Sequence, residues 1–282
     1  MAIVATNKST SLLDGIRELA RYRDEDPVAT AFNVGNSFFA TNEQWRRAVE
    51  VAPPDSDNFG CGEYRAPGTP AEIMEHYRRC VPQVEQQVFA TYGIPGEIAL
   101  RERIVAMVEP GMTVLDFGAG IGSQLVPLVA KGCRCVHVDV GGVMMDYASW
   151  RYQQLRPARG PTGPSCPSDG PSYTTSGGVD LIALRDDYME VGVPNLRGRT
   201  FDVVICTEVI EHVTEPEKFV EKLAQWVKPG GLCVATTSFD DGDGMVPMHL
   251  NIDKYDDESF AAEVFPRYGL VPFEESFYRK RS

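Results

Sequence analysis

Three residues that can exchange a proton or hold a metal ion lie within five positions of one another. Glu208, Glu211 and His212 follow the strongly apolar residues 201–206, which are typical of a buried strand. If this segment is helical, Glu208 shares a face with Glu211 or His212. Two carboxylates and an imidazole suit acid–base chemistry or coordination of Mg²⁺, Mn²⁺ or Zn²⁺. His249, which follows the next apolar run, is a candidate fourth ligand or a base.

A second group of residues forms a glycine-rich turn. A short apolar run reaches Asp116, and glycine then occupies every second position from 118 to 122. Glycine allows a sharp turn and has no Cβ atom to keep a ligand away from the backbone. Residues 123–131 are expected to form the helix that follows, with Gly132 ending it. A strand, a glycine turn and a helix form the first half of a nucleotide-binding α/β unit.

The spacing of these glycines bears on which nucleotide binds. Dinucleotide-binding turns have the pattern G-x-G-x-x-G, whereas Gly122 comes one residue earlier than this pattern requires. Asp116 also precedes the first glycine, and its carboxylate would repel a pyrophosphate. The same carboxylate suits a ligand that carries an amino group and a sulfonium. The turn therefore disfavours a nicotinamide-dependent dehydrogenase.

The pattern D-x-G-x-G-x-G resembles the first motif of class I S-adenosylmethionine (SAM) methyltransferases. The later segments FDVV, EVIEHV and KPGG resemble further motifs of that superfamily in the same order, and the resemblance covers residues 104–237. It implies an α/β fold that is Rossmann-like, with a mostly parallel central sheet flanked by helices. It also implies that SAM is the cofactor.

The resemblance places the cofactor contacts at the carboxyl ends of the strands. Asp139 ends the strand expected over residues 133–139 and would hold the ribose hydroxyls; the alternative is a cap for the helix expected over residues 141–155. An acid after the strand at residues 179–184 would accept a hydrogen bond from the adenine amino group. The expected contacts are Asp116, Gly118, Ala119, Gly120, Gly122, Asp139, Val140, Asp186, Asp187, Thr207 and Glu208.

The E-x-x-E-H pattern of Glu208, Glu211 and His212 resembles the metal-binding motif of ubiquinone-pathway O-methyltransferases and of small-RNA 2′-O-methyltransferases. The same pattern occurs in many class I methyltransferases with no assigned metal. In those enzymes the histidine packs near the substrate or acts alone as a base. Two hypotheses follow, a divalent metal held with His249 and a lone His212 base.

Composition narrows the choice of acceptor. The net charge of −13 repels polyphosphate backbones, so we expect a small-molecule acceptor and no nucleic acid. The resemblance to O-methyltransferases implies that this acceptor is methylated at oxygen. An N- or C-methyltransferase of a small molecule, an RNA or protein methyltransferase and a non-catalytic SAM-binding protein are the alternatives. No apolar run reaches the length of a membrane span, and the first residues do not resemble a signal peptide. We therefore expect a cytoplasmic protein with no membrane contact, whose seven cysteines are reduced.

The remaining segments are expected to shape the substrate pocket. Residues 1–98 are interpreted as an N-terminal helical extension that covers the site, and residues 99–282 as the SAM-binding domain, with a flexible insertion at 156–178. Helices are expected over residues 12–23, 42–51, 95–108 and 256–268, with another starting at Pro70. Aromatic residues of the extension either contact substrate or pack the helices together: Phe32, Phe38, Phe39, Phe59, Tyr64 and Tyr92.

The C-terminal end departs from the usual pattern of the fold. Class I methyltransferases close their sheet with two antiparallel strands, whereas only residues 270–278 show a strand pattern here. Either the last strand is short or missing, or the hairpin is arranged differently. The nature of this sheet edge bears on whether the chain forms a homodimer.

Overall fold

A computed structural model describes residues 11–35, 70–79, 81–155, 173–184, 196–239, 249–250 and 254–282. The strands are β1 (Thr113–Phe117), β2 (Arg134–Asp139), β3 (Tyr173–Ser176), β4 (Val179–Ala183), β5 (Phe201–Cys206), β6 (Val227–Ala235), β7 (Leu270–Glu274) and β8 (Phe277–Lys280). The helices are α1 (Leu12–Arg23), α3 (Pro70–Arg79), α4 (Val81–Gly93), α5 (Pro95–Met107), α6 (Leu125–Ala130), α7 (Val143–Gln154), the 3-10 turn η2 (Ile210–His212), α9 (Pro216–Trp226) and α10 (Asp257–Arg267). Residues 27–35 are also helical.

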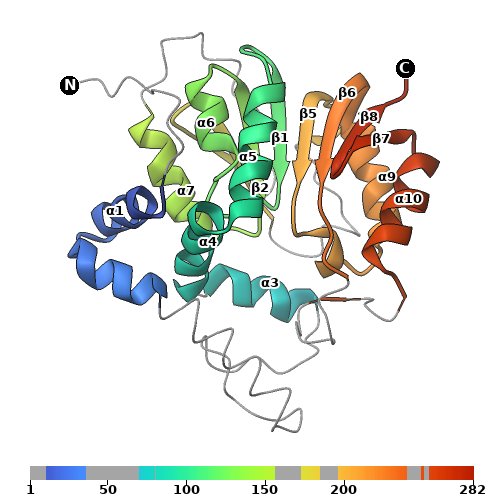
Figure 1. The fold of residues 1–282 in the computed structure, drawn as a ribbon. Helices are drawn as coiled ribbons and strands as arrows, with labels where there is room; N and C mark the ends of the chain where they lie inside the picture. The colour runs from blue at the N-terminus through green and yellow to red at the C-terminus, as the bar shows by residue number, and fades with distance from the viewer. Residues whose placement is uncertain are drawn as a thin grey trace, which may run out of the picture.

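The strands form one eight-stranded sheet in the order β3-β4-β2-β1-β5-β6-β8-β7. Neighbouring strands from β4 to β6 run parallel, and β3, β7 and β8 pair antiparallel with their neighbours. This arrangement, flanked by helices in Figure 1, confirms the expected α/β fold with a mostly parallel sheet.

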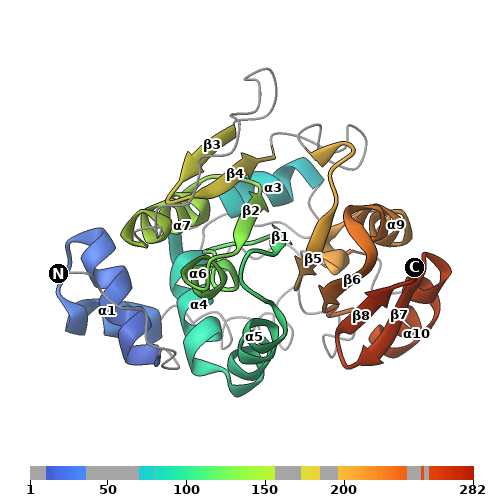
Figure 2. The same ribbon diagram turned by 90° about the horizontal axis from the view of Figure 1, so that it is seen from above.

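Both faces of the sheet are covered, which explains why its inner strands are almost continuously apolar. On one face, Leu115 and Phe117 of β1 pack in a core that includes Phe219 of α9 and Phe260 of α10. On the other, Val114 of β1 packs in a core that includes residues of α5, α6 and α7. Figure 2 shows these two groups of helices on opposite sides of the sheet.

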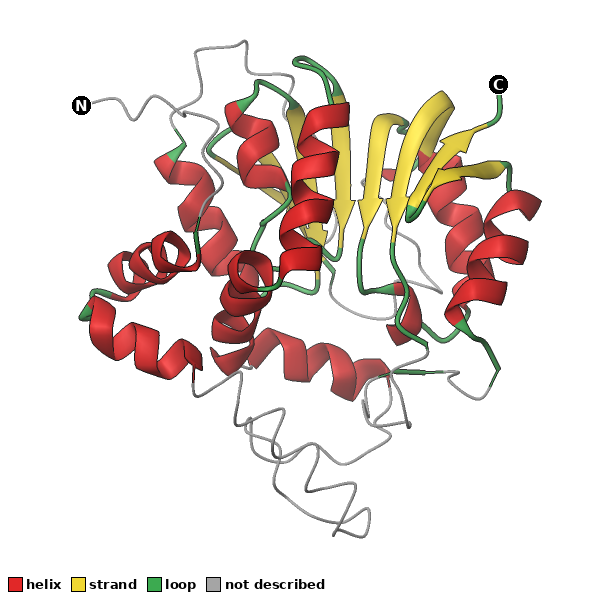
Figure 3. Cartoon of the chain, viewed as in Figure 1, coloured by secondary structure: helices red, strands yellow, loops and turns green. Residues whose placement is uncertain are grey.

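The N-terminal helices form a layer of their own beside this sheet. Ile16 and Leu19 of α1 are buried with Val88 of α4 and Tyr147 of α7. Helix α3 instead crosses below the sheet at the edge formed by the carboxyl ends of its parallel strands, as Figures 1 and 3 show. Helix α3 therefore reaches the edge of the sheet at which the expected site residues lie.

Three expectations about local structure need correction. The loop expected over residues 156–178 contains β3 at its end, paired with β4. The turn expected at residues 228–231 lies within β6, which starts at Val227 and shifts its register against β5. The single strand expected over residues 270–278 is a hairpin, in which Ser276 turns the chain with a φ of 61°. The closing pair of antiparallel strands that is usual for this fold is therefore present, although the sequence left it in doubt.

Among the helices that the structure describes, none has the length and apolar character needed to cross a membrane. Cys133, Cys135, Cys206 and Cys233 are buried and unpaired, as small apolar side chains of the sheet.

Candidate active site

The glycine turn lies where the order of the strands reverses. Strand β1 has β2 on one side and β5 on the other, so its carboxyl end borders the crevice in which open α/β sheets bind ligands. Gly118, Gly120 and Gly122 have left-handed backbones, with φ values of 75°, 51° and 73°. The backbone N–H groups of Gly118 and Ala119 donate to the Val138 carbonyl, at 2.8 and 3.1 Å. The turn is thereby fixed to the end of β2.

Side chains from other elements occupy the space beside these glycines. A Cβ atom on Gly118 would overlap the side chain of Val209, which follows β5. A Cβ atom on Gly120 would overlap the carboxamide of Gln87, from α4. The turn is therefore enclosed between the segment after β5 and the N-terminal helices, and side chains at these positions would disrupt it.

Asp139 ends β2 and faces the same turn. One of its carboxylate oxygens accepts the N–H of Gly120 at 2.6 Å, and the other accepts the N–H of Val140 at 2.7 Å. Burial raises the pKa of Asp139 to about 6, and these two N–H donors limit the rise. The alternative role as a helix cap is wrong, since Gly142 is the N-cap of α7. The role in ribose binding remains a prediction.

Asp116 lies beneath the turn as a second buried carboxyl group. It is 1% exposed, and its Oδ2 atom has no hydrogen-bond partner among the described residues. Burial, and next the Asp139 carboxylate, raise the pKa of Asp116 to about 8. An acidic group left in this state is suited to a cationic ligand, such as the amino group that the sequence predicted.

The displaced pKa of Asp116 predicts how stability depends on pH. Its folded value lies above the usual value near 4, so its ionisation destabilises the fold as pH rises from about 4 to about 8. Asp116→Asn should remove this contribution. Between pH 5.5 and 7.5, the free energy of unfolding should therefore fall by about 1–3 kcal/mol more in the wild type than in this variant. Urea unfolding at both pH values measures the effect.

The control for this prediction is Asp146→Asn, at an exposed position in the first turn of α7. This control should keep the wild-type pH dependence. An Asp116→Asn protein with the same pH dependence as the wild type would contradict the prediction.

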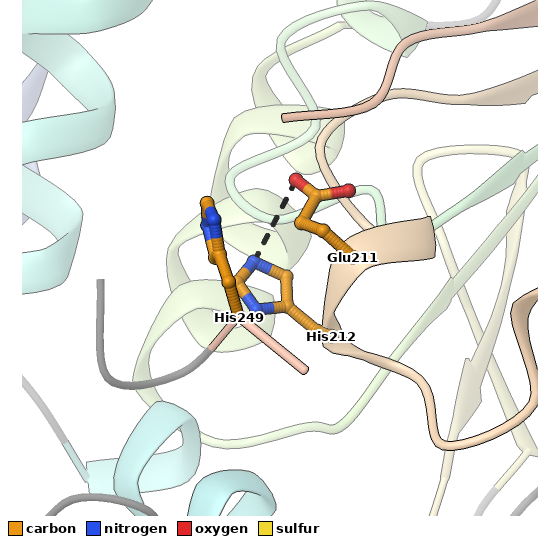
Figure 4. Close-up of side chains that lie close together, drawn as sticks. All are labelled: Glu211, His212 and His249. Atoms are coloured by element: carbon orange, nitrogen blue, oxygen red, sulfur yellow. Dashed lines mark ion pairs between the residues drawn. The ribbon is translucent and has the colours of Figure 1, made fainter. Parts of the chain in front are cut away.

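A cluster of three ligand-type side chains lies just after β5. Glu211, His212 and His249 each bring one ligand atom within 4.8 Å of the others, and Figure 4 shows the three side chains pointing toward one another. The His212 Nε2 atom lies 3.9 Å from Glu211 Oε1, and the His212 and His249 ring centroids are 4.8 Å apart. The backbone N–H of Leu250 donates to the Glu211 carbonyl at 2.6 Å, which holds the His249 segment beside η2.

Glu211 is the most constrained member of this cluster. Glu211 is fully buried, and neither of its carboxyl oxygens makes a hydrogen bond of normal geometry within the described part of the chain. Burial, and next the Glu208 carboxylate, raise the pKa of Glu211 well above its usual value. A buried carboxyl group of this kind is stable only when it is protonated or paired with a cation.

Glu208 lies outside this cluster, which corrects the conditional prediction of a helix. Its φ of 55° breaks the chain direction directly after β5, and only η2 is helical before α9. The hydroxyls of Thr236 and Ser238 donate to its two carboxylate oxygens, at 2.8 and 2.5 Å. Glu208 is therefore oriented toward the end of β6, and the cluster has three members rather than four.

Helix α3 supplies two contacts that sequence reasoning did not assign to the site. The Tyr77 hydroxyl lies 3.4 Å from His212 Nε2. Arg78 donates to the carbonyls of Val140 and Leu184, at 3.0 and 2.9 Å, and so bridges the ends of β2 and β4. Helix α3 therefore covers both the cluster and the neighbouring strand ends.

The remaining residues that were predicted to contact cofactor or substrate divide into three groups. Thr207 follows β5 at the same edge of the sheet. Tyr92 is buried within the helices, which supports the packing interpretation, whereas Phe32 is exposed. Some predicted residues lie outside the described part of the chain: Phe38, Phe39, Phe59, Tyr64, Asp186 and Asp187.

A known family matches most of this architecture. Residues 86–270 match a family described as a methyltransferase domain. The chain belongs to this family. It contains a SAM-dependent methyltransferase domain, as the glycine turn and the ordered motifs predicted.

Curated relatives of this methyltransferase are ubiquinone biosynthesis O-methyltransferases. The protein from Rickettsia canadensis is 27% identical over 127 residues, which are 45% of this chain and 42% of that protein. The protein from Mesorhizobium japonicum is 27% identical over 156 residues, which are 55% of this chain and 49% of that protein. The matched region therefore spans about half the length of these relatives.

Solved structures share the fold of this methyltransferase. An O-methyltransferase family protein from Burkholderia thailandensis has a TM-score of 0.55 and 14% identity, covering 89% of this chain and 71% of that one. The N-methyltransferase NodS from Bradyrhizobium japonicum, solved with S-adenosyl-L-homocysteine, has a TM-score of 0.51 and 13% identity. It covers 76% of this chain and 100% of that one. At these identities the likeness shows the fold alone.

The described residues of the methyltransferase fit its cofactor. The glycine turn lies at the switch point of the sheet, and its three glycines hold left-handed backbone conformations there. The Asp116 carboxyl, whose Oδ2 atom has no hydrogen-bond partner among the described residues, lies under the turn, and the Asp139 carboxylate lies beside it. These groups match the cationic and hydroxyl-bearing parts of SAM.

Proposed function

We propose that this methyltransferase transfers the SAM methyl group to a hydroxyl oxygen of a small molecule. The observation that carries the proposal is the cluster of Glu211, His212 and His249 beside the glycine turn. Val209 immediately precedes η2 and contacts Gly118, so it links the cluster to the glycine turn. The O-methyltransferase relatives and the net charge of −13 support a small-molecule acceptor over a nucleic acid.

His212 is the proposed base of this reaction. When bound, SAM supplies a methyl group already activated by its sulfonium, which departs with the electron pair of the broken bond. An acceptor hydroxyl needs to lose its proton as the new carbon–oxygen bond forms. The His212 imidazole takes this proton, and the Tyr77 hydroxyl at 3.4 Å orients the ring. Helix α3 helps to exclude water, since it covers this edge of the sheet.

A divalent metal at the cluster is the second candidate, and the unpartnered Glu211 carboxyl favours it. One carboxylate and two imidazoles form a donor set that Zn²⁺ or Mn²⁺ accepts more readily than Mg²⁺, which prefers oxygen ligands. Glu211, His212 and His249 would hold the ion. Such an ion would lower the pKa of an acceptor hydroxyl.

Thermal unfolding with S-adenosylhomocysteine tests the metal, because a ligand that binds only the folded state raises the melting temperature. If the cluster holds a metal, Zn²⁺ or Mn²⁺ should raise the melting temperature by several degrees more, and a chelator should reverse the rise. Glu211→Gln should abolish this extra rise, whereas Glu221→Gln, at an exposed position of α9, should retain it. A wild-type protein whose melting temperature is indifferent to both Zn²⁺ and Mn²⁺ would exclude the metal candidate and leave His212 as the base.

The oxygen acceptor has its own test. The purified chain is incubated with SAM and matched pairs of aromatic alcohols and amines, and release of S-adenosylhomocysteine is measured. We expect turnover with hydroxyl members and little with their amine counterparts. Turnover confined to the amines would contradict the proposed acceptor and favour an N-methyltransferase.

A further inference from the structure

The glycine turn is held from both sides at a single residue, Ile121. Its backbone N–H donates to the Oε1 atom of Gln87 on α4, at 3.1 Å. Its carbonyl accepts from the Nη1 atom of Arg151 on α7, at 2.7 Å. These two bonds fix the peptide planes between Gly120 and Gly122 within the glycine turn. Neither Gln87 nor Arg151 belongs to a motif that the sequence identified.

Arg151 connects the turn to the N-terminal helices. The residue is 2% exposed, although arginine is almost never buried without several partners. Its Nε atom lies 3.3 Å from the Glu18 carboxylate of α1, and its Nη2 atom donates to the Tyr92 hydroxyl of α4. Its guanidinium also lies 5.6 Å from the centre of the Tyr147 ring. The buried Arg151 side chain therefore contacts α1, α4 and the glycine turn.

The packing around Tyr92 makes this connection rigid. A Cβ atom on Gly15 of α1 would overlap the Tyr92 ring, so α1 approaches α4 closely at this point. The Arg101 guanidinium lies 5.0 Å from the centre of the same ring and donates to the Thr91 carbonyl at 2.5 Å. Displacement of α1 would therefore disturb the Tyr92 hydroxyl and, through it, Arg151.

We propose that Arg151 is a positioning residue through which helices α1 and α4 set the affinity of the glycine turn for SAM. The N-terminal helices then act on cofactor binding at a distance, in addition to covering the substrate edge. Because coupling between two sites is reciprocal, cofactor binding should also stabilise α1. The inference requires SAM as the cofactor and holds for any acceptor.

Affinity for S-adenosylhomocysteine, measured by calorimetry at 20 °C, tests the proposal. Arg151→Lys keeps the charge but cannot reach Ile121, Tyr92 and Glu18 together, so we expect the dissociation constant to rise at least about tenfold. Glu18→Gln removes only the ion pair on α1 and should raise the dissociation constant about threefold to tenfold. Arg17→Met alters the neighbouring exposed position and should leave the dissociation constant within about twofold of the wild-type value.

Amide hydrogen exchange separates positioning from a purely structural role. In the wild type, S-adenosylhomocysteine should slow exchange across residues 12–23, which Arg151 links to the glycine turn and which share a hydrophobic core with Ile121. In Arg151→Lys the slowing should be lost, even at ligand concentrations that saturate the site. Variants that melt earlier but bind with wild-type affinity, and still protect α1, would overturn the proposal and leave Arg151 as a stabilising residue only.

Discussion

Asp139→Ala is expected to weaken binding of S-adenosylhomocysteine by at least about a hundredfold. Asp139 is held at the turn by the N–H groups of Gly120 and Val140, with its carboxylate at the carboxyl end of β2. Two ribose hydroxyls would each donate to this charged group, and hydrogen bonds to charged groups contribute about 1.5–3 kcal/mol each. The alanine variant also leaves the Gly120 N–H without its acceptor. Isothermal calorimetry at pH 7.5 measures the loss.

The matched control for this variant is Asp180→Ala. Asp180 lies on the neighbouring strand β4, where its carboxylate pairs with Arg199 at 3.6 Å. Its removal should leave the dissociation constant near the wild-type value. Equal affinity of Asp139→Ala and the wild type would exclude Asp139 from the ribose site.

The pH dependence of binding follows from the same carboxylate. Since the pKa of Asp139 is about 6 in the free protein, the ionised form predominates above pH 6. The contribution of Asp139 to nucleoside affinity should therefore be constant at higher pH and decline by up to about tenfold per unit below pH 6. Asp139→Asn should lack this decline, because it has no carboxyl group to protonate.

The parallel core of the fold can be predicted from sequence because its strands are buried on both faces. Strands β1, β2, β4 and β5 appear as short apolar runs, and turn residues mark most of their ends. Helix α1 can be predicted to the residue, since Ser11 and Asp14 form a capping box at its start. In these elements, local sequence and tertiary burial favour the same structure.

The sheet edges could not be predicted in the same way. Strand β3 consists of a tyrosine, two threonines and a serine, and it lies at one edge of the sheet, so it shows no apolar pattern. The hairpin of β7 and β8 turns at Ser276, whose positive φ is not signalled by a glycine or asparagine. Pairing with a neighbouring strand, rather than local propensity, determines both structures.

The site itself was predictable only where a motif falls on one strand end. The glycine turn, Asp139 and the pair of Glu211 and His212 are local features of this kind. Tyr77 contacts His212, and Arg151 contacts Glu18. Each pair joins residues more than a hundred positions apart in the sequence, and no distinctive sequence pattern marks either contact. Glu208 shows the opposite error, because its spacing suits a helix but its φ of 55° prevents one.

His212→Ala is expected to lower kcat by about 10²–10⁴-fold while affinity for S-adenosylhomocysteine stays within about threefold of wild type. Removing a positioned base costs a rate factor of this size. The groups proposed to bind the cofactor lie in the turn and at the end of β2, whereas His212 contacts Tyr77, Glu211 and His249. Single-turnover kinetics with saturating SAM measure the chemical step directly.

Tyr77→Phe makes a smaller change beside the same histidine. It removes the hydroxyl beside His212 Nε2 but keeps the aromatic ring, which lies edge-on to the imidazole with centroids 5.7 Å apart. We expect a smaller fall in kcat, of about threefold to thirtyfold, because the base remains but is held less firmly. If His212→Ala instead abolishes nucleoside binding, the histidine supports the site structurally and the proton acceptor has to be sought elsewhere. If only kcat falls, and falls further in the alanine than in the phenylalanine variant, the cluster after β5 performs the chemistry.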